Sequence, residues 1–328
     1  MKLLTNQTGI PLSLAVWLAT DTYKHNPNPN AISATSLIQP IRSIVLARQN
    51  RDLDQIGDIV SLVASQSGTA YHDGIRNAWL SPKLKETLKT LNYSDTVINR
   101  IVVNPPSGYE AKEDDIIIWT EIRTEKTVDK FLITGKLDFC AEGNLEDHKS
   151  TSVYALIFGS NAESYSLQGS IYRWLNPDKI TGESVQINYI FTDWSKSAAM
   201  RDKEYPQKRI LAKQYPLMSI QETDTWIKGR LQQIALLSNA PQHTLPLCTK
   251  EELWQSDSVF KYYKDPTKTA RSTKNFDNMA DAQTRLGADG HVGKVLEVVG
   301  QVKKCQFCKV NTICDQAKDL VATGLLIL

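Results

Sequence analysis

Three charged residues lie close together in a pattern that could hold a divalent cation. Asp138 closes the stretch ITGKLD, and the stretch LEDHKST then places Asp147 and Lys149 two positions apart. In an extended strand, residues i and i+2 project from the same face, so the Asp147 carboxylate and the Lys149 ammonium would enter one site while His148 faces away. Carboxylate oxygens suit Mg²⁺ or Mn²⁺, and the lysine would lie beside water bound to that ion.

Phosphodiester hydrolysis needs these parts, because a metal activates water and polarises phosphate while a cation positions the nucleophile. An isolated Asp-x-Lys pair is weak evidence, since charged residues alternate on many exposed strands. Further residues raise the specificity: His72 follows a small-residue turn in GTAYH, and Gln168 and Tyr172 are four apart on one helical face. Glu121, on the preceding strand, is a weaker candidate for supporting the metal ligands. Two acidic neighbours are expected to be solvated: Glu142 and Glu146.

The elements that must position these residues follow from the hydrophobic periodicity. Apolar residues recur at three- and four-residue steps from about 52 to 79, which predicts a helix around His72. The stretch 115–140 alternates in β-branched and aromatic residues between charged turns, which predicts a meander of strands. Further elements are expected as follows: helices over 84–91, 161–175 and 222–239, and strands over 145–150, 185–194 and 209–217. The sum predicts a mixed α/β domain.

Length and composition favour one large core with a smaller addition. The 328 residues are 41% hydrophobic and 23% charged, as in ordinary globular proteins. We expect an N-terminal helical lead-in over residues 1–50, a core over 51–240, and a small cysteine-containing module packed on that core over 241–328. No apolar run approaches the roughly 18 residues that cross a bilayer, and the opening residues lack a signal-peptide pattern, so we expect a cytoplasmic protein without a membrane partner.

The C-terminal segment carries a cysteine pattern typical of metal ligation. Cys305, Cys308 and Cys314 form C-x2-C-x5-C, and Cys248 is the natural fourth thiolate. A [4Fe-4S] cluster and a structural Zn²⁺ both suit four sulfur ligands, and the spacing does not separate them. Free thiols in a flexible tail are the alternative interpretation. Cys140, two residues beyond Asp138, is expected to be a small buried hydrophobic residue.

Nucleic-acid contacts would depend on local charge, because the net charge is only +2. Basic residues gather over 196–213 and over 259–274, and the second cluster also contains Phe260, Tyr262 and Tyr263, whose rings could stack on bases. A solvated surface explains such clusters equally well. The weaker DNA-binding candidates are Arg201, Lys203, Lys208, Arg209, Lys261 and Lys264.

The ordered set of motifs resembles the PD-(D/E)xK nuclease superfamily, and within it the RecB-like exonuclease branch. That branch has G-T-x-x-H, G-x-x-D, D-x-K and Q-x-x-x-Y in this order, which correspond here to Gly68–His72, Gly135–Asp138, Asp147–Lys149 and Gln168–Tyr172. Counting softer flanking matches, the resemblance covers roughly residues 30 to 320. It implies a restriction-endonuclease-like core, with a central mixed sheet flanked by helices.

The resemblance also implies a role for each motif residue. His72, Asp138 and Asp147 would bind the metal together with the backbone carbonyl of His148. Lys149 would orient or activate the attacking water. Two further residues would fix the site and engage the DNA strand: Gln168 and Tyr172.

The cysteine triplet adds to the resemblance and also departs from it. Several RecB-like nucleases are similar at this end, where such a triplet completes an iron-sulfur cluster. In many of them the fourth cysteine precedes the nuclease core, whereas no cysteine precedes Cys140 here.

The family resemblance predicts an Mg²⁺- or Mn²⁺-dependent deoxyribonuclease, and an exonuclease in particular. It would act on DNA ends or single strands in recombination, repair or phage DNA metabolism, inside a bacterial or phage-infected cell. A single-strand-binding or recombination protein is a candidate partner. A catalytically silent DNA-binding scaffold with a structural metal-sulfur site is the alternative, and loss of Asp138, Asp147 or Lys149 would have favoured it. A metal-sulfur interaction module alone would leave the motif set unexplained.

Overall fold

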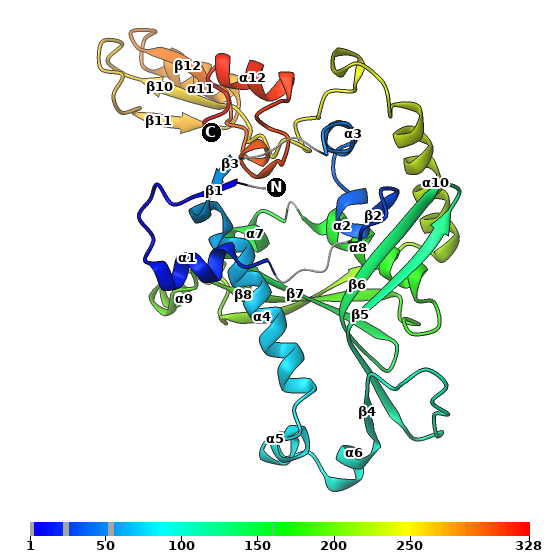
Figure 1. Cartoon of the computed structure of the whole chain (residues 1–328). Helices are drawn as coiled ribbons and strands as arrows, with labels where there is room; N and C mark the ends of the chain where they lie inside the picture. The colour runs from blue at the N-terminus through cyan, green and yellow to red at the C-terminus, as the bar shows by residue number, and fades with distance from the viewer. Residues whose placement is uncertain (1–2, 22–25, 52–55, 160) are drawn as a thin grey trace. The chain divides into compact units, whose positions relative to one another are not determined.

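The computed structural model describes residues 3–21, 26–51, 56–159 and 161–328 (Figure 1). Its contacts divide the chain into two compact units. The first comprises residues 1–38 and 52–232, and the second comprises residues 39–51 and 233–328. The segment 39–51, expected within the N-terminal lead-in, therefore groups with the C-terminal residues. No helix in the described parts of the chain combines the length and the apolar character that a membrane crossing requires.

The first unit is built on a seven-stranded mixed sheet with the order β4-β5-β6-β7-β8-β9, in which β2 also pairs with β6. Neighbours run parallel in β4/β5, β7/β8 and β2/β6, and antiparallel in β5/β6, β6/β7 and β8/β9. The strands are β2 (Ala31–Ser33), β4 (Ile101–Val103), β5 (Ile116–Val128), β6 (Phe131–Ala141), β7 (Asn144–Thr151), β8 (Ser184–Phe191) and β9 (Ile210–Pro216). Helices flank this sheet, so the predicted α/β class with a mixed central sheet is confirmed.

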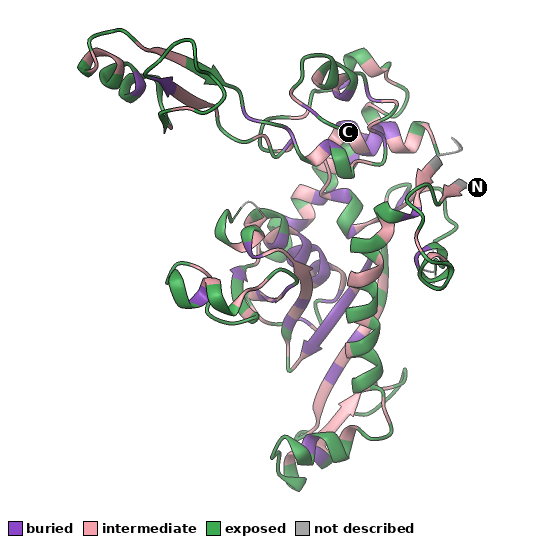
Figure 2. Ribbon diagram, turned by 90° about the vertical axis from the view of Figure 1, so that its left-hand side faces the viewer, coloured by how far each residue is buried: buried purple, intermediate pink, exposed green. Residues whose placement is uncertain are grey.

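The helices of this unit match most of the predicted spans. They are α1 (Leu12–Ala19), α2 (Ala34–Leu37), α4 (Val63–Trp79), α5 (Leu84–Thr90), α6 (Asp95–Arg100), α7 (Val153–Ile157), α8 (Ala162–Leu175), α9 (Lys196–Arg201) and α10 (Ile220–Leu236), whose last residues belong to the second unit. A short parallel pair joins β1 (Leu3–Thr5) to β3 (Ile56–Asp58). Among these helices, α4 has no buried residue, whereas α8 buries half of its length (Figure 2).

The helix that carries His72 begins later than its periodicity suggested. Residues 52–55 of the predicted span lie outside the described residues, and β3 and a 3-10 turn over Ile59–Leu62 precede α4. Asp58 causes this start, because its Oδ1 accepts a hydrogen bond from the Val60 backbone N–H at 3.0 Å and so caps the turn. The α-helix then runs from Val63 and still carries His72.

The expected helical lead-in also contributes a strand to the central sheet. Strand β2 pairs in parallel with β6, with Ile32 opposite Ile133. Ser33 ends that strand and caps α2, since its Oγ accepts a hydrogen bond from the Ser36 backbone N–H at 3.1 Å. A three-residue strand carries too little periodicity to be recognised from the sequence, and the neighbouring β6 stabilises it.

Burial along the strands explains why the sheet forms. Strand β8 alternates strictly between half-buried and buried positions, as expected when one face packs more tightly than the other. Strand β6 alternates at first and is then continuously buried from Leu137 to Cys140, so both faces are covered there. Asp138 lies inside this buried stretch, where a carboxylate requires a specific partner.

The second unit has a three-stranded antiparallel sheet, in the order β11-β10-β12, that the sequence did not predict. Its elements are α3 (Ile41–Gln49), a 3-10 turn at Gln242–Thr244, β10 (Val259–Tyr263), β11 (Lys274–Phe276), α11 (Met279–Ala288), β12 (Lys294–Val298), a 3-10 turn at Lys304–Phe307 and α12 (Asp315–Ala322). Its apolar core joins residues of α3 to the cysteine-rich segment, including Val45, Leu46, Cys305 and Cys314. The cysteines therefore lie within a packed core.

Candidate functional site

The candidate site lies where β6 and β7 separate. Their ladder has three residue pairs, from Ala141↔Asn144 to Phe139↔Glu146, and then the strands diverge. Beyond that point, Asp138 Oδ2 accepts a hydrogen bond from the His148 backbone N–H at 2.9 Å. If the ladder between β6 and β7 continued, the His148 N–H would bind a backbone carbonyl of β6. Here it binds the Asp138 carboxylate instead.

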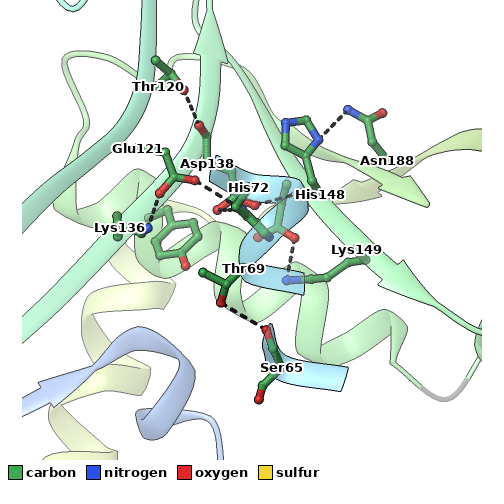
Figure 3. Close-up of polar contacts among 12 residues, drawn as sticks. Ser65, Thr69, His72, Thr120, Glu121, Lys136, Asp138, His148, Lys149 and Asn188 are labelled. Atoms are coloured by element: carbon green, nitrogen blue, oxygen red, sulfur yellow. Dashed lines mark hydrogen bonds and ion pairs between the residues drawn. The ribbon is translucent and has the colours of Figure 1, made fainter. Parts of the chain in front are cut away.

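Three potential ligands converge here, and Asp138 is one of them (Figure 3). One ligand atom from each of His72, Glu121 and Asp138 lies within 4.8 Å of the other two. His72 Nδ1 is 3.3 Å from Glu121 Oε1 and 3.4 Å from Asp138 Oδ1. Helix α4 supplies the imidazole, whereas β5 and β6 supply the carboxylates. Lys136 forms an ion pair with the other oxygen of Glu121, Oε2.

Glu121 takes a larger part in this group than its sequence position suggested. The sequence ranked it as support for the ligands, whereas the structure places its carboxylate among the potential ligand atoms. Its φ of +54° lies in the left-handed region, which costs a non-glycine residue about 1 kcal/mol or more. Strain of this kind is common at functional sites. A single acid in the apolar run IIIWTEI was the signal available in the sequence.

A second group of polar side chains adjoins the first through β7 and α8. Lys149 Nζ lies 2.6 Å from Asp147 Oδ2, and the two residues share a face of β7. Gln168 Nε2 donates to Asp147 Oδ1 at 3.0 Å and to the Tyr172 hydroxyl at 2.8 Å, while Gln168 Oε1 lies 3.4 Å from Lys149 Nζ. One amide therefore holds the aspartate, the lysine and the tyrosine in a fixed arrangement.

Two glycines let α8 approach the sheet closely enough to make these bonds. A Cβ on Gly135 of β6 would meet Leu175 Cδ1 at 2.6 Å and Tyr172 Cδ1 at 3.1 Å. A Cβ on Gly169 of α8 would meet the Val185 side chain at 2.9 Å. The glycine of the G-x-x-D motif thus has a steric reason in this fold, because any side chain there would push the helix away.

The surroundings of Asp138 disfavour the ionised form of its carboxyl group. Burial, and next the neighbouring Asp147 carboxylate, raise the pKa of Asp138 to about 7. The hydrogen bond with Glu121 raises the pKa of His72, although burial opposes this shift. Burial acts to raise the pKa of Glu121, but its bonds with His72 and Lys136 outweigh burial and lower it. A divalent cation would relieve the repulsion between the carboxylates, and the donor set of carboxylate oxygens and one imidazole fits Mg²⁺ or Mn²⁺.

Two further features concern Asp147 and Lys149. Asp147 is 2% exposed, and its Oδ2 accepts no well-aligned hydrogen bond from the described residues although the lysine ammonium lies beside it. Burial alone would lower the pKa of Lys149, but Asp147 and Asp138 overcome that effect and raise it. The lysine is therefore protonated in the metal-free site. The under-bonded Asp147 oxygen is a second observation that fits a cation.

The backbone and the side chain of His148 make different contacts. Its imidazole Nδ1 lies 3.4 Å from Asn188 Nδ2, and its ring centre lies 6.2 Å from that of His72. Burial lowers the pKa of its imidazole. Its backbone N–H binds Asp138, while metal binding by its carbonyl remains a prediction.

Tyr165 is a site neighbour that the sequence did not single out. Its ring centre lies 5.8 Å from Lys149 Nζ, and its edge meets the rings of Tyr189 and Tyr215. Tyr165 precedes Gln168 by three residues, so it lies on the same face of α8. That spacing was the available signal.

The basic candidates differ in their surroundings. In the first unit Arg201, Lys203, Lys208 and Arg209 are exposed, as a contact with phosphate would require. In the second unit Lys264 is exposed and Lys261 is half-buried. The idea that both tyrosines between them stack on bases is wrong, because Tyr262 and Tyr263 are buried and the Tyr262 hydroxyl donates to Asp289 at 2.7 Å. As consecutive residues of β10, they point to opposite faces of the small sheet and are buried on both.

All four cysteines of the C-terminal pattern belong to the second unit. Cys305 and Cys314 are buried in its core, and Cys248 and Cys308 are half-buried against it. Burial, followed by Glu252 and the other three cysteines, raises the pKa of Cys248 to about 12. Cys140 lies in the first unit, fully buried on β6, and its thiol donates to the Lys179 carbonyl at 3.2 Å. Cys140 is thus the small buried residue that the sequence predicted.

Comparisons with known proteins provide little further information. No family model matches the chain, and no curated protein matches it in sequence. The crystal structure of a protein called SSO0001 is 18% identical with a TM-score of 0.36, over 73% of this chain and 89% of that one. A phage-related exonuclease from Haemophilus somnus 129PT is 16% identical with a TM-score of 0.25, over 38% of this chain and 63% of that one. Neither likeness is close enough to assign a fold family.

Proposed function

We propose that this chain is a metal-dependent DNA nuclease with a restriction-endonuclease-like core of the RecB-like exonuclease branch. The proposal is carried by one observation: the potential ligand atoms of His72, Glu121 and Asp138 converge beside the bonded group of Asp147, Lys149 and Gln168. These residues come from five separate elements, α4, β5, β6, β7 and α8, so their convergence does not follow from local structure. The motif resemblance supplies the substrate class, DNA.

Each residue has a definite part in the proposed reaction. His72, Glu121, Asp138 and Asp147 would hold Mg²⁺ or Mn²⁺, which when bound supplies positive charge to the phosphate and makes its bound water more acidic. The Lys149 ammonium can donate to the attacking water or to a phosphate oxygen, and so offset the charge that develops there.

The remaining residues keep Lys149 in place and guide the substrate. The Asp147 carboxylate orients the ammonium at 2.6 Å, and Gln168 orients that carboxylate in turn. Tyr172 is held by the same amide. The exposed basic residues around α9 would contact the DNA backbone outside the site, and ends or single strands are the expected substrates.

The decisive test is DNA degradation by the purified full chain. Labelled single- and double-stranded DNA, linear and circular, would be incubated with Mg²⁺, Mn²⁺ or EDTA. We expect metal-dependent loss of linear DNA, and a loss of activity of at least about 100-fold in Asp147→Asn and Lys149→Ala. Glu146→Gln is the matched control, because Glu146 neighbours Asp147 on β7 but contacts Asn188. Equal rates for the parent and both site variants would disprove the proposal.

We further propose that Cys248, Cys305, Cys308 and Cys314 hold an iron-sulfur cluster. Four thiolates suit either a [4Fe-4S] cluster or a tetrahedral Zn²⁺. All four cysteines belong to or pack against one core of the second unit, which fits such a site. The resemblance of the C-x2-C-x5-C triplet to that of several RecB-like nucleases supports the cluster.

The metal content of the anaerobically purified chain tests the cluster. Stoichiometric iron and sulfide, with absorbance near about 400 nm that is lost in Cys305→Ser, is the expected result. Zinc without iron or sulfide would exclude the cluster and leave the nuclease proposal intact.

A further inference from the structure

Arg42 is a buried charge in the second unit. It lies in the first turn of α3 and is 3% exposed. Its Nη1 donates to the carbonyl oxygens of Gln242 at 3.2 Å and Leu245 at 3.0 Å, and Nη2 lies 3.4 Å from Gln242 Oε1. Its Nε donates to Cys314 Sγ at 3.3 Å. A side chain 272 positions away in sequence thus binds one of the four cysteines.

The charge of this guanidinium requires an anion nearby. Arginine stays charged inside proteins, and burying an uncompensated charge is strongly unfavourable. Within the described residues, no carboxylate forms an ion pair with Arg42, and its oxygen partners are neutral. The remaining partner is the Cys314 sulfur, which is a weak acceptor as a thiol but a full anion as a metal-bound thiolate. The contacts of Arg42 therefore indicate a negatively charged cysteine site.

The next residue makes a similar contact. Ser43 Oγ lies 3.5 Å from Cys308 Sγ, and its hydroxyl can donate to that sulfur. Two adjacent residues of α3 thus contact two different cysteines of the pattern. Four thiolates around a dication, or around a cluster core of the same charge, leave a net charge of about −2, which one guanidinium would partly neutralise.

We propose that Arg42 is the positioning residue of the four-cysteine site. It supplies the counter-charge for the thiolates, orients Cys314 as a ligand, and withdraws electron density from its sulfur, while Ser43 acts in the same way on Cys308. This inference rests on the proposed metal-sulfur site. Hydrogen bonds to ligand sulfurs raise the reduction potential of a cluster and strengthen retention of the metal.

A purely structural role would account for only some of the contacts. The bonds from Nη1 to two carbonyls could simply anchor α3, as Gln49 does by donating to the carbonyls of Ser238 at 3.1 Å and Ala240 at 3.0 Å. Within the described residues Gln49 forms no hydrogen bond with a cysteine, so Gln49→Ala is a matched control for the anchoring of the helix. The bond from Nε to sulfur distinguishes Arg42 from this control.

The experiment compares full-length parent, Arg42→Gln, Arg42→Lys and Gln49→Ala chains. Each is reconstituted anaerobically with ferrous iron and sulfide, and in a parallel sample with Zn²⁺ alone. Two quantities are measured: the rate at which a chelator removes the metal, and the midpoint reduction potential of the iron-loaded form. A residue that only anchors the helix would leave the potential unchanged.

We expect Arg42→Gln to lose metal roughly 10- to 100-fold faster than the parent and to have a lower reduction potential. Arg42→Lys keeps the positive charge but lacks the several N–H donors of a guanidinium. Its rate of metal loss and its reduction potential should therefore lie between those of the parent and those of Arg42→Gln. Gln49→Ala should match the parent.

The outcomes separate this inference from the proposal beneath it. If the parent chain retains neither iron nor zinc, the proposed metal-sulfur site is disproved, and the proposed role of Arg42 is disproved with it. If the parent retains metal and Arg42→Gln has the same release rate and reduction potential as the parent, only the proposed role of Arg42 is disproved. Faster release in Arg42→Gln and Gln49→Ala alike, with the potential unchanged, would make Arg42 only an anchor and overturn the inference.

Discussion

Burial and a neighbouring like charge both act against ionisation of Asp138. The residue is 7% exposed, and its carboxyl lies near Asp147 and has its pKa raised to about 7. The His148 N–H and the His72 imidazole compensate for only part of this cost. A bound cation would remove most of it, so the site should be least stable when it is empty and ionised.

The stability of the metal-free protein should therefore fall as the pH rises. The unfolded carboxyl titrates near about 4, whereas the folded one titrates near 7, so the folded state holds this proton more tightly. Its stabilising contribution is complete below about pH 4 and is lost on the way to pH 7. Melting temperatures in EDTA from pH 4 to 8 measure this loss, which is on the order of 1–4 kcal/mol.

Asp138→Asn provides the comparison, because an amide cannot ionise and its oxygen can still accept from His148. The variant should be more stable than the parent in EDTA at pH 8, and Mg²⁺ should no longer raise its melting temperature. A parent that becomes more stable than the variant between pH 5 and pH 8 would show that Asp138 ionises without penalty.

Glu121 permits a second residue-scale prediction. If its carboxylate is a metal ligand, Glu121→Gln should weaken Mg²⁺ or Mn²⁺ binding by roughly 10-fold or more, measured by calorimetry. The ion pair with Lys136 would also be lost. Glu125→Gln, on the same strand but exposed, is the control. Unchanged metal affinity in Glu121→Gln would return Glu121 to the supporting role that the sequence suggested.

At the scale of elements, the fit of α8 against β6 decides whether the polar network forms. Gly135→Ala would place a methyl group 2.6 Å from Leu175 Cδ1 and 3.1 Å from Tyr172. We expect a loss of about 1–3 kcal/mol in unfolding free energy. Because α8 also carries Gln168, a displaced helix would loosen Asp147, and nuclease activity should fall as well.

Gly68→Ala is the matched control for this prediction. The added methyl group would lie 3.5 Å from Ser150 Oγ, which is an ordinary contact, so stability should change by less than about 1 kcal/mol. Chemical denaturation of both variants measures the difference. Equal losses in the two variants would show that close packing of α8 is not the reason for the glycine in G-x-x-D.

At the scale of the whole molecule, the two units should respond separately to removal of the cysteine-bound metal. Cys305 and Cys314 lie in the same core as Val45 and Leu46 of α3, so the metal would crosslink that core. After chelation, amide hydrogen exchange should accelerate in residues 39–51 and 233–328 and remain slow in the central sheet. Uniform acceleration throughout the chain, or none, would contradict this prediction.

Local chemistry in the sequence determined much of the candidate site. The period of a strand is enough to place Asp147 and Lys149 on one face, and the period of a helix is enough to align Gln168 with Tyr172. The same periodicities predicted α8 and the strands β7 to β9 close to their observed bounds, and a meander of strands over the stretch that β5 and β6 occupy. These features depend on neighbours within a few residues, which the sequence displays directly.

Only the tertiary structure decided which distant residues meet. His72 and Glu121 are 49 positions apart, and Arg42 and Cys314 are 272 apart, so no local pattern links either pair. Strand β2 exists because β6 offers it an edge, and α3 belongs with the cysteines because apolar side chains of both share a core. Contacts of this kind depend on how separate segments pack, since burial and charge act through space and not along the chain.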